Sequence, residues 1–196
     1  MPNFHSPAKV NLTLDILGRD PNGYHRLQTI IMEYSELYDI ITIDFAEQDC
    51  VETLNIPQSQ NLAYKALQLF KKHFKIHRNF HIKIIKNIPI SSGLGGGSSN
   101  ASTVLKALNQ LTNTNASQAE LAELAAQIGM DTPFFIYGGT CFCTGYGEKV
   151  EKLPDAKIKI QVQAKASRKT NKTATAFEQL DLSKCGKNTE DTQALL

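Results

Sequence analysis

The residues best suited to chemistry lie in one glycine-rich run, PISSGLGGGSSNAST, at residues 89–103. An alternating apolar segment precedes the run and apolar residues at helical spacing follow it, which predicts a strand, a turn and a helix beginning near Ser98. Glycines let several backbone N–H groups converge on one point, and the positive end of a helix favours an anion there. The run therefore predicts a phosphate-binding loop, with Ser98 and Ser99 as hydroxyl donors or magnesium ligands.

A glycine-rich connector without a ligand is the alternative interpretation, because such motifs are weak evidence when they stand alone. This run is denser in glycine than a connector requires. It is not a Walker loop, since no Lys-Ser or Lys-Thr pair follows the glycines, and it lacks the ribose-binding acid of a Rossmann turn. Nucleotide binding would therefore use another architecture.

Two charged residues outside the glycine loop, Lys9 and Asp131, are candidates for catalysis. Lys9 and Asn11 share the polar face of an alternating segment, residues 9–17, which predicts a strand; a solvent-facing lysine is the plain interpretation. Asp131 comes just before Thr132 and Pro133, and Pro is favoured at the first position of a helix. A helix cap is therefore the alternative to catalysis for Asp131.

Tyr24 and His25 follow a strong turn signal, DPNG at residues 20–23. They could be ordinary residues at the end of a strand. An adjacent aromatic ring and imidazole also suit stacking on a nucleobase and hydrogen bonding to its edge.

The elements that must position these residues form an α+β pattern. Asn61 predicts the N-cap of one helix, and Ser117 with Glu120 predicts a capping box closed by Gly129 as the C′ glycine. The predicted strands are 27–34, 38–45, 80–86, 138–144, 148–152 and 157–163, and the predicted helices are 61–74, 98–111, 117–129, one from residue 133, and 174–180.

Composition limits the function classes. The chain has 196 residues, 41% of them hydrophobic, and a net charge of +2, which indicates a soluble globular protein without a nucleic-acid partner. Its four cysteines are dispersed, which favours reduced thiols and a cytoplasmic location. Neither a signal peptide nor a membrane span is expected.

Four motifs in order resemble those of the kinases related to galactokinase, homoserine kinase, mevalonate kinase and phosphomevalonate kinase. They are SPAKVNLTLDI, PNGYHRLQTI, IPISSGLGGGSSNAS and IGMDTPFFIYGG with GYGEKVEKL after it, between about Ser6 and Leu153. The resemblance implies the two-layer α+β N-terminal domain of that family, of the ribosomal protein S5 domain 2-like type, at residues 1–164. Residues 165–196 would be the incomplete start of a C-terminal domain or a mobile tail.

The resemblance also implies an ATP-dependent small-molecule kinase that uses Mg²⁺. Asp131 would take or orient the proton of the acceptor hydroxyl, and Lys9 would hold the carboxylate and the developing charge. Substrate contacts fall to Asn11, Tyr24, His25 and Thr173, with Ser98 as a metal ligand. The implied ATP contacts are Asn61, Lys86, Pro89, Gly93, Leu94, Gly95, Gly96, Gly97, Ser98, Ser99 and Asn100.

Within the family, NGYHRLQT is most similar to the members that phosphorylate the 2-hydroxyl of 4-diphosphocytidyl-2-C-methyl-D-erythritol in non-mevalonate isoprenoid biosynthesis. A kinase for mevalonate or homoserine is an alternative. The family's second domain has no counterpart after Leu180, so the chain looks truncated, and a non-catalytic nucleotide-binding remnant is a further alternative. Self-association, weak ATP binding and poor turnover are expected of such an open half-site.

Overall fold

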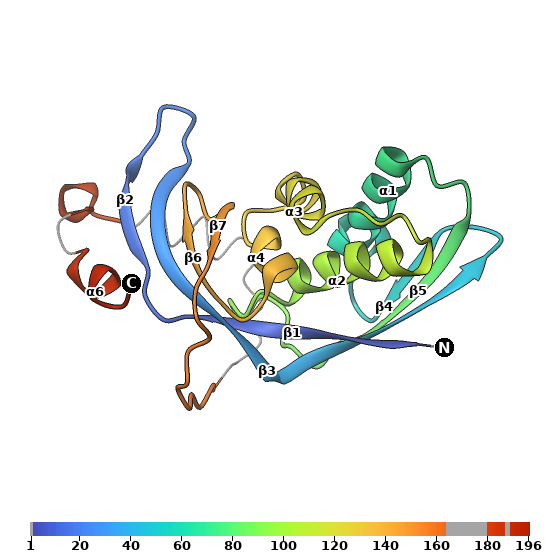
Figure 1. Cartoon of the computed structure of the whole chain (residues 1–196), viewed down its shortest axis with the longest axis horizontal. Coiled ribbons are helices and arrows are strands. Elements are labelled where there is room, and N and C mark those ends of the chain that lie inside the picture. Colours follow the sequence, from blue (N-terminus) through green and yellow to red (C-terminus); the bar gives the residue numbers. More distant parts are fainter. Residues whose placement is uncertain (1, 164–179, 187–188) are drawn as a thin grey trace.

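The computed structural model describes residues 2–163, 180–186 and 189–196. A seven-stranded sheet is organised around one long strand, β3 (His25–Ala46), which bends as it crosses the molecule (Figure 1). The other strands are β1 (Asn3–Asn11), β2 (Asp15–Arg19), β4 (Cys50–Thr53), β5 (Asn79–Ile85), β6 (Thr140–Thr144) and β7 (Lys149–Lys152).

Both edges of β3 are paired, and this brings distant parts of the chain together. β1 and β2 pair antiparallel with one edge, while β5 and β6 pair antiparallel with different halves of the other. β4 extends the sheet parallel to β5, and β7 extends it antiparallel to β6. Among the described strands β1 is paired with β3 alone, so Lys9 lies on an edge strand of the sheet.

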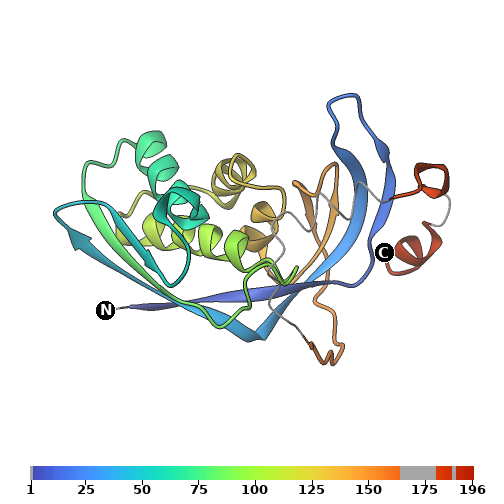
Figure 2. The same cartoon turned by 180° about the vertical axis from the view of Figure 1, so that it is seen from behind.

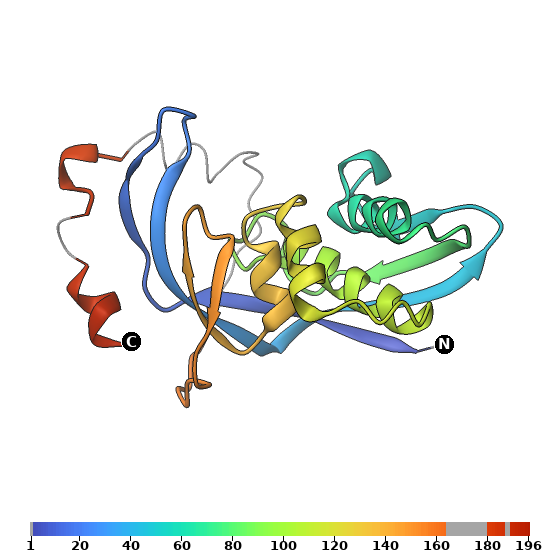
Figure 3. The same cartoon turned by 45° about the horizontal axis from the view of Figure 1, so that its top comes forward.

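Four helices cover one face of this sheet, as Figure 3 shows most clearly. They are α1 (Leu62–Phe74), α2 (Gly96–Leu111), α3 (Gln118–Ala126) and α4 (Thr132–Tyr137), with a short 3₁₀ turn, η1 (Gln58–Gln60), before α1. The main core joins Ile43 of β3 and Ile82 of β5 to Phe70 of α1 and Leu105 of α2. The predicted α+β class is confirmed.

α2 is the central helix, and every residue from 99 to 105 is buried. The remaining described segments, η2 (Leu182–Lys184) and α6 (Glu190–Ala194), lie beside β2, which Figure 2 shows from behind. The N–H of Gly186 donates to the carbonyl of Ile16 at 2.8 Å and ties this part of the chain to β2. The expected 174–180 helix lies outside the described residues except for Leu180, which is not helical.

Four strand predictions were wrong in their extent or their existence. The runs 27–34 and 38–45 form one strand, because Ser35, Glu36 and Leu37 bulge opposite the Pro7–Ala8 step of β1 without ending the ladder. The predicted 9–17 strand is split, since β1 ends at Asn11 and β2 begins at Asp15. Residues 157–163 alternate but form no strand; Val162 instead packs on Ala8, Ile88 and Leu94.

Two helix boundaries also differ from the prediction, while two caps are confirmed. Asn61 accepts from the N–H of Ala63 as the N-cap of α1, and Ser117 forms the capping box with Glu120. α2 begins at Gly96, two residues before Ser98. α3 ends at Ala126 with Gln127 as its C-cap, so Gly129 is not the C′ glycine.

Cysteine reactivity gives a first testable prediction. Cys141 and Cys143 are fully buried on β6, and burial raises the pKa of Cys141 to about 11 and that of Cys143 to about 12. Cys50 and Cys185 are partly exposed. We expect a disulfide reagent at neutral pH to label Cys50 and Cys185 in the native protein and the other two thiols only after unfolding. Equal labelling rates for all four thiols in native buffer would contradict this placement.

Among the described residues, each helix is too short or too polar to cross a lipid bilayer.

Candidate functional site

The glycine loop connects β5 to α2 and is fastened to β1. Gly95, the N-cap of α2, has a left-handed conformation with φ of 72°, and the Lys9 N–H donates to the Leu94 carbonyl at 3.0 Å. A Cβ on Gly95 would lie 2.8 Å from Cγ of Lys9 and 2.8 Å from the Phe135 ring. Both the backbone conformation and the crowding therefore require glycine.

The first turn of α2 is equally crowded on its other side. A Cβ on Gly96 would lie 3.0 Å from Ile88 and 3.1 Å from the Lys86 ammonium, whereas Gly93, with φ of 86°, faces open space. The unpaired N–H groups of a helix N-terminus attract anions. Close packing behind the loop and open space in front of it are what a backbone cradle for phosphate requires.

Two cavities meet at this loop. The larger, about 770 Å³, is lined by Lys9, Asn11 and Asp131 among others, and the smaller, about 290 Å³, lies on the side of Pro89 and Lys86. Gly93, Gly95 and Ser98 line both cavities. The loop therefore separates two binding volumes that share a boundary, an arrangement suited to group transfer between two molecules.

Lys9 and Asp131 lie together in the larger cavity. The Lys9 ammonium is 3.5 Å from a carboxylate oxygen of Asp131 and donates to Oδ1 of Asn11 at 2.5 Å. Asn11 in turn donates to the Thr29 hydroxyl at 2.8 Å. Lys9 is only 5% exposed, so the interpretation as a solvent-facing lysine is wrong. A buried ammonium held by neighbouring oxygens is fixed in position.

Asp131 occupies the N-cap position of α4, but its side chain makes no capping hydrogen bond. Its side chain is 42% exposed, toward the larger cavity, and its φ and ψ are −80° and −10°. The capping alternative is therefore wrong for this carboxylate. The carboxylate is available to a ligand in the cavity.

A buried polar network beneath the loop escaped the sequence analysis. Asp39 on β3 is fully buried, and its carboxylate accepts from the N–H groups of Asn87 and Ile88, from Asn100 and from the Lys86 ammonium. Ser6 donates to Ser99 at 2.8 Å in the same network. The side chains of Ser99 and Asn100 therefore point into the protein interior, while Ser98 remains at the cavities.

Two tyrosines from distant parts of the chain line the larger cavity near its rim. Tyr24 is 52% exposed, and its ring centroid lies 5.2 Å from that of Tyr146, which precedes β7. The hydroxyl of Tyr146 donates to Asp20 and accepts from Asn22 in the turn before Tyr24. His25 lines the same cavity. Sequence reasoning found Tyr24 and His25 but missed Tyr146, although GYGEKV is part of a recognised motif.

Other expected site residues lie elsewhere. Asn61 is buried as a helix cap and donates to Thr53, and Leu94 is buried with Ala8 and Ile88, so neither side chain lines a cavity. Pro89 and Gly97 line the smaller cavity. Thr173 lies outside the described residues.

The family model of the GHMP kinases N terminal domain matches residues 61–139. The 4-diphosphocytidyl-2-C-methyl-D-erythritol kinase of Caldicellulosiruptor saccharolyticus is 44% identical over 194 residues, covering 96% of this chain and 66% of that relative. The kinase of the same name from Clostridium tetani is 46% identical over 74% of this chain and 53% of its own length. The chain thus spans 53–66% of the length of these two curated relatives.

Solved structures agree with these relatives. A crystal structure of 4-(cytidine 5′-diphospho)-2C-methyl-D-erythritol kinase matches with a TM-score of 0.68 at 34% identity, over 78% of this chain and 55% of that one. A mevalonate kinase shares the fold at 21% identity, with a TM-score of 0.59 over 79% of this chain and 56% of that one. This chain belongs to the GHMP kinase family, whose N-terminal domain it contains.

Proposed function

We propose that this protein acts as an ATP-dependent kinase on the 2-hydroxyl of 4-diphosphocytidyl-2-C-methyl-D-erythritol. The observation that carries the proposal is the Lys9–Asp131 pair, which lies in the larger cavity beside the loop that borders the smaller one. The names of relatives at 44% and 46% identity support the choice of acceptor.

ATP, the phosphoryl donor of the family, would have its base on the side of the smaller cavity. Ile56, Leu62 and Ile90 supply apolar surface there, and the loop glycines with the N-terminus of α2 suit its phosphates. Ser98 and Asp131 offer oxygen ligands of the kind that Mg²⁺ prefers. The resemblance also implies ATP contacts at Ser99, Asn100 and Leu94. Because these three residues are buried, they would act through their backbone or by supporting the loop from below.

In this proposal Asp131 accepts the proton of the acceptor hydroxyl, because its carboxylate is open to the cavity and unengaged by a helix cap. Lys9 fixes the carboxylate and offers positive charge to the oxygens of the phosphoryl group during transfer. Asn11 accepts a hydrogen bond from the Lys9 ammonium and is itself held in place by donating to the Thr29 hydroxyl. The burial of Lys9 means that water competes little for its charge.

The rim of the larger cavity suits the cytidyl end of the acceptor. Tyr24 and Tyr146 offer aromatic faces, and His25 offers ring nitrogens for hydrogen bonding. Arg19 lines the same cavity and supplies a positive charge for the diphosphate. Thr173 stays a predicted contact. We also propose a cytoplasmic location and no nucleic-acid or membrane partner, based on composition.

We expect Tyr24→Leu to weaken the cytidyl acceptor by roughly 1–3 kcal/mol, the range for stacking of a base on an aromatic ring. Tyr24→Phe keeps the ring and should bind almost normally. Isothermal titration calorimetry with the acceptor and, separately, with ATP measures both affinities. Phe45→Leu is the matched control, because Phe45 is an exposed aromatic residue that lines neither cavity. Equal losses for acceptor and ATP would contradict a pyrimidine site at Tyr24.

A further inference from the structure

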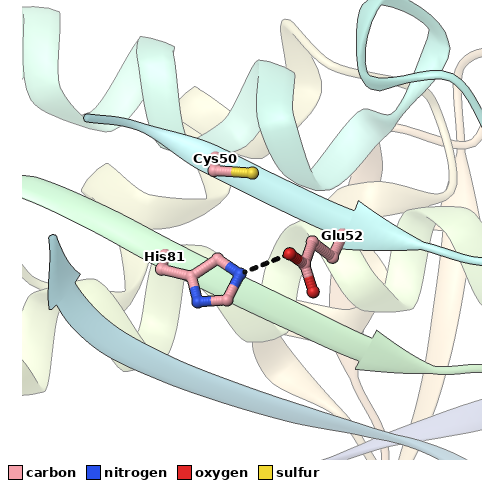
Figure 4. Close-up of side chains that lie close together, drawn as sticks. All are labelled: Cys50, Glu52 and His81. Atoms are coloured by element: carbon pink, nitrogen blue, oxygen red, sulfur yellow. Dashed lines mark ion pairs between the residues drawn. The ribbon is translucent and has the colours of Figure 1, made fainter. Parts of the chain in front are cut away.

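Three side chains with metal-binding atoms meet near the end of the sheet remote from β7. Cys50 and Glu52 lie on β4 and His81 lies on β5, and their ligand atoms are all within 4.8 Å of one another. Figure 4 shows the His81 ring directed at the Glu52 carboxylate on the neighbouring strand. The His81 Nε2 and the Glu52 Oε1 are 3.2 Å apart.

Strand pairing explains why the three meet. Cys50 is paired with His81 in the parallel β4–β5 register, and Glu52 follows Cys50 by two residues, so all three share one face. Val51, which lies between Cys50 and Glu52, and its strand partner Ile82, which follows His81, belong to the opposite face and are buried under the helices. The cluster therefore lies on the face away from the helices, where the side chains of His81 and Glu52 are 36% and 57% exposed.

We propose that Cys50, Glu52 and His81 form a Zn²⁺ site that links β4 to β5. Thiolate sulfur, imidazole nitrogen and carboxylate oxygen are the ligand types of zinc sites with three protein ligands, and a water molecule takes the fourth position. Bond lengths of about 2.0–2.3 Å place tetrahedral ligand atoms roughly 3.3–3.7 Å apart. The His81–Glu52 distance already lies near that range, and side-chain rotation brings the sulfur closer.

Neighbouring charge is mixed but includes a second carboxylate. Asp44 of β3 is paired with His81 on its other side and therefore shares its face, which adds negative charge beside the site. Lys83 is paired with Glu52 and supplies one opposing positive charge. On binding, the Cys50 thiol loses its proton to solvent, and neutral His81 binds the metal through Nε2 in place of its contact with Glu52.

The site would stabilise a short strand that leads to the smaller cavity. β4 has only four residues, and the segment after it supplies Ile56 and Leu62 to that cavity. None of the three ligands lines either cavity. Metal binding here is thus separate from the proposed kinase chemistry, and its test needs no activity measurement.

The test is a Co²⁺ titration of the full 196-residue chain without a polyhistidine tag, followed by displacement with Zn²⁺. We expect one equivalent of Co²⁺ to give a thiolate-to-cobalt charge-transfer band, which Zn²⁺ abolishes. Cys50→Ser should remove the band, and His81→Ala should weaken Co²⁺ binding by at least about tenfold, as loss of even an outer partner does. Cys185→Ser is the matched control and should keep the band, because Cys185 is the other partly exposed cysteine.

Thiol labelling provides a second readout that does not depend on the stability of the variants. One equivalent of Zn²⁺ should slow the reaction of Cys50 in the unmutated chain by at least about tenfold and leave Cys185 unchanged. Absence of a charge-transfer band, a band that survives in Cys50→Ser, or equal protection of both cysteines would each overturn the proposal.

Discussion

We expect Asp131→Asn to lower phosphoryl transfer by about 10²–10⁴-fold, the usual contribution of a positioned general base. The amide is nearly isosteric with the carboxylate but cannot take the hydroxyl proton. The fold should be unaffected, because the Asp131 side chain caps no helix and is partly exposed. Single-turnover transfer from γ-labelled ATP measures the chemistry, and urea unfolding measures the stability.

Glu123→Gln is the control for this experiment, since Glu123 is an exposed carboxylate on α3 outside both cavities. It should leave transfer and stability unchanged. If Asp131→Asn transfers the phosphoryl group at the rate of the unmutated chain with both ligands bound, Asp131 is not the general base.

The second large effect concerns stability. We expect Asp39→Ala to lower the free energy of unfolding by about 3–5 kcal/mol, the cost of removing one partner from a buried ion pair. The change leaves the N–H of the buried Ile88, the Lys86 ammonium and the N–H of Asn87 without their carboxylate partner. Total stabilities are about 5–15 kcal/mol, so this loss is large. Urea unfolding followed by circular dichroism measures it.

Asp44→Ala is the matched control, because Asp44 lies on the same strand but is only partly buried, and it should cost less than about 0.5 kcal/mol. Asp39→Asn, which keeps one acceptor oxygen, should lower the free energy of unfolding by an amount between those of Asp39→Ala and Asp44→Ala. A cost below about 1 kcal/mol for Asp39→Ala would mean that this network does not fasten the glycine loop.

Local chemistry explains the parts of the fold that could be predicted. The Asn61 cap and the Ser117–Glu120 capping box each depend on residues within three positions, so their sequence signals are complete in themselves. The continuity of β3 could not be predicted, because residues 35–37 bulge and stay in the strand only because Tyr34 and Tyr38 on either side of them are paired with β1. β4 was missed for the same reason, since its four residues are held by β5.

Some residues of the candidate site could likewise be predicted from the sequence, and others could not. The glycine loop, Lys9 and Asp131 could be proposed from motifs, and the structure brings them into one cavity. Asp39 gave no signal, because its donors come from residues 86–100, far away in sequence. The direction of Ser99 depends on α2 beginning at Gly96, and an error of two residues in that boundary changes which serine faces the loop. The domain division at residues 164 and 165 stays a prediction.

The central claim is that the two cavities hold ATP and a cytidyl acceptor on either side of one loop. Its most direct test is a single-turnover assay with the chain in excess over γ-labelled ATP and with three acceptors in parallel. They are 4-diphosphocytidyl-2-C-methyl-D-erythritol, mevalonate and homoserine. We predict that the label moves to the cytidyl acceptor alone. Transfer to mevalonate or homoserine at an equal rate, or release of the label only as phosphate while the cytidyl acceptor is bound, would contradict the account.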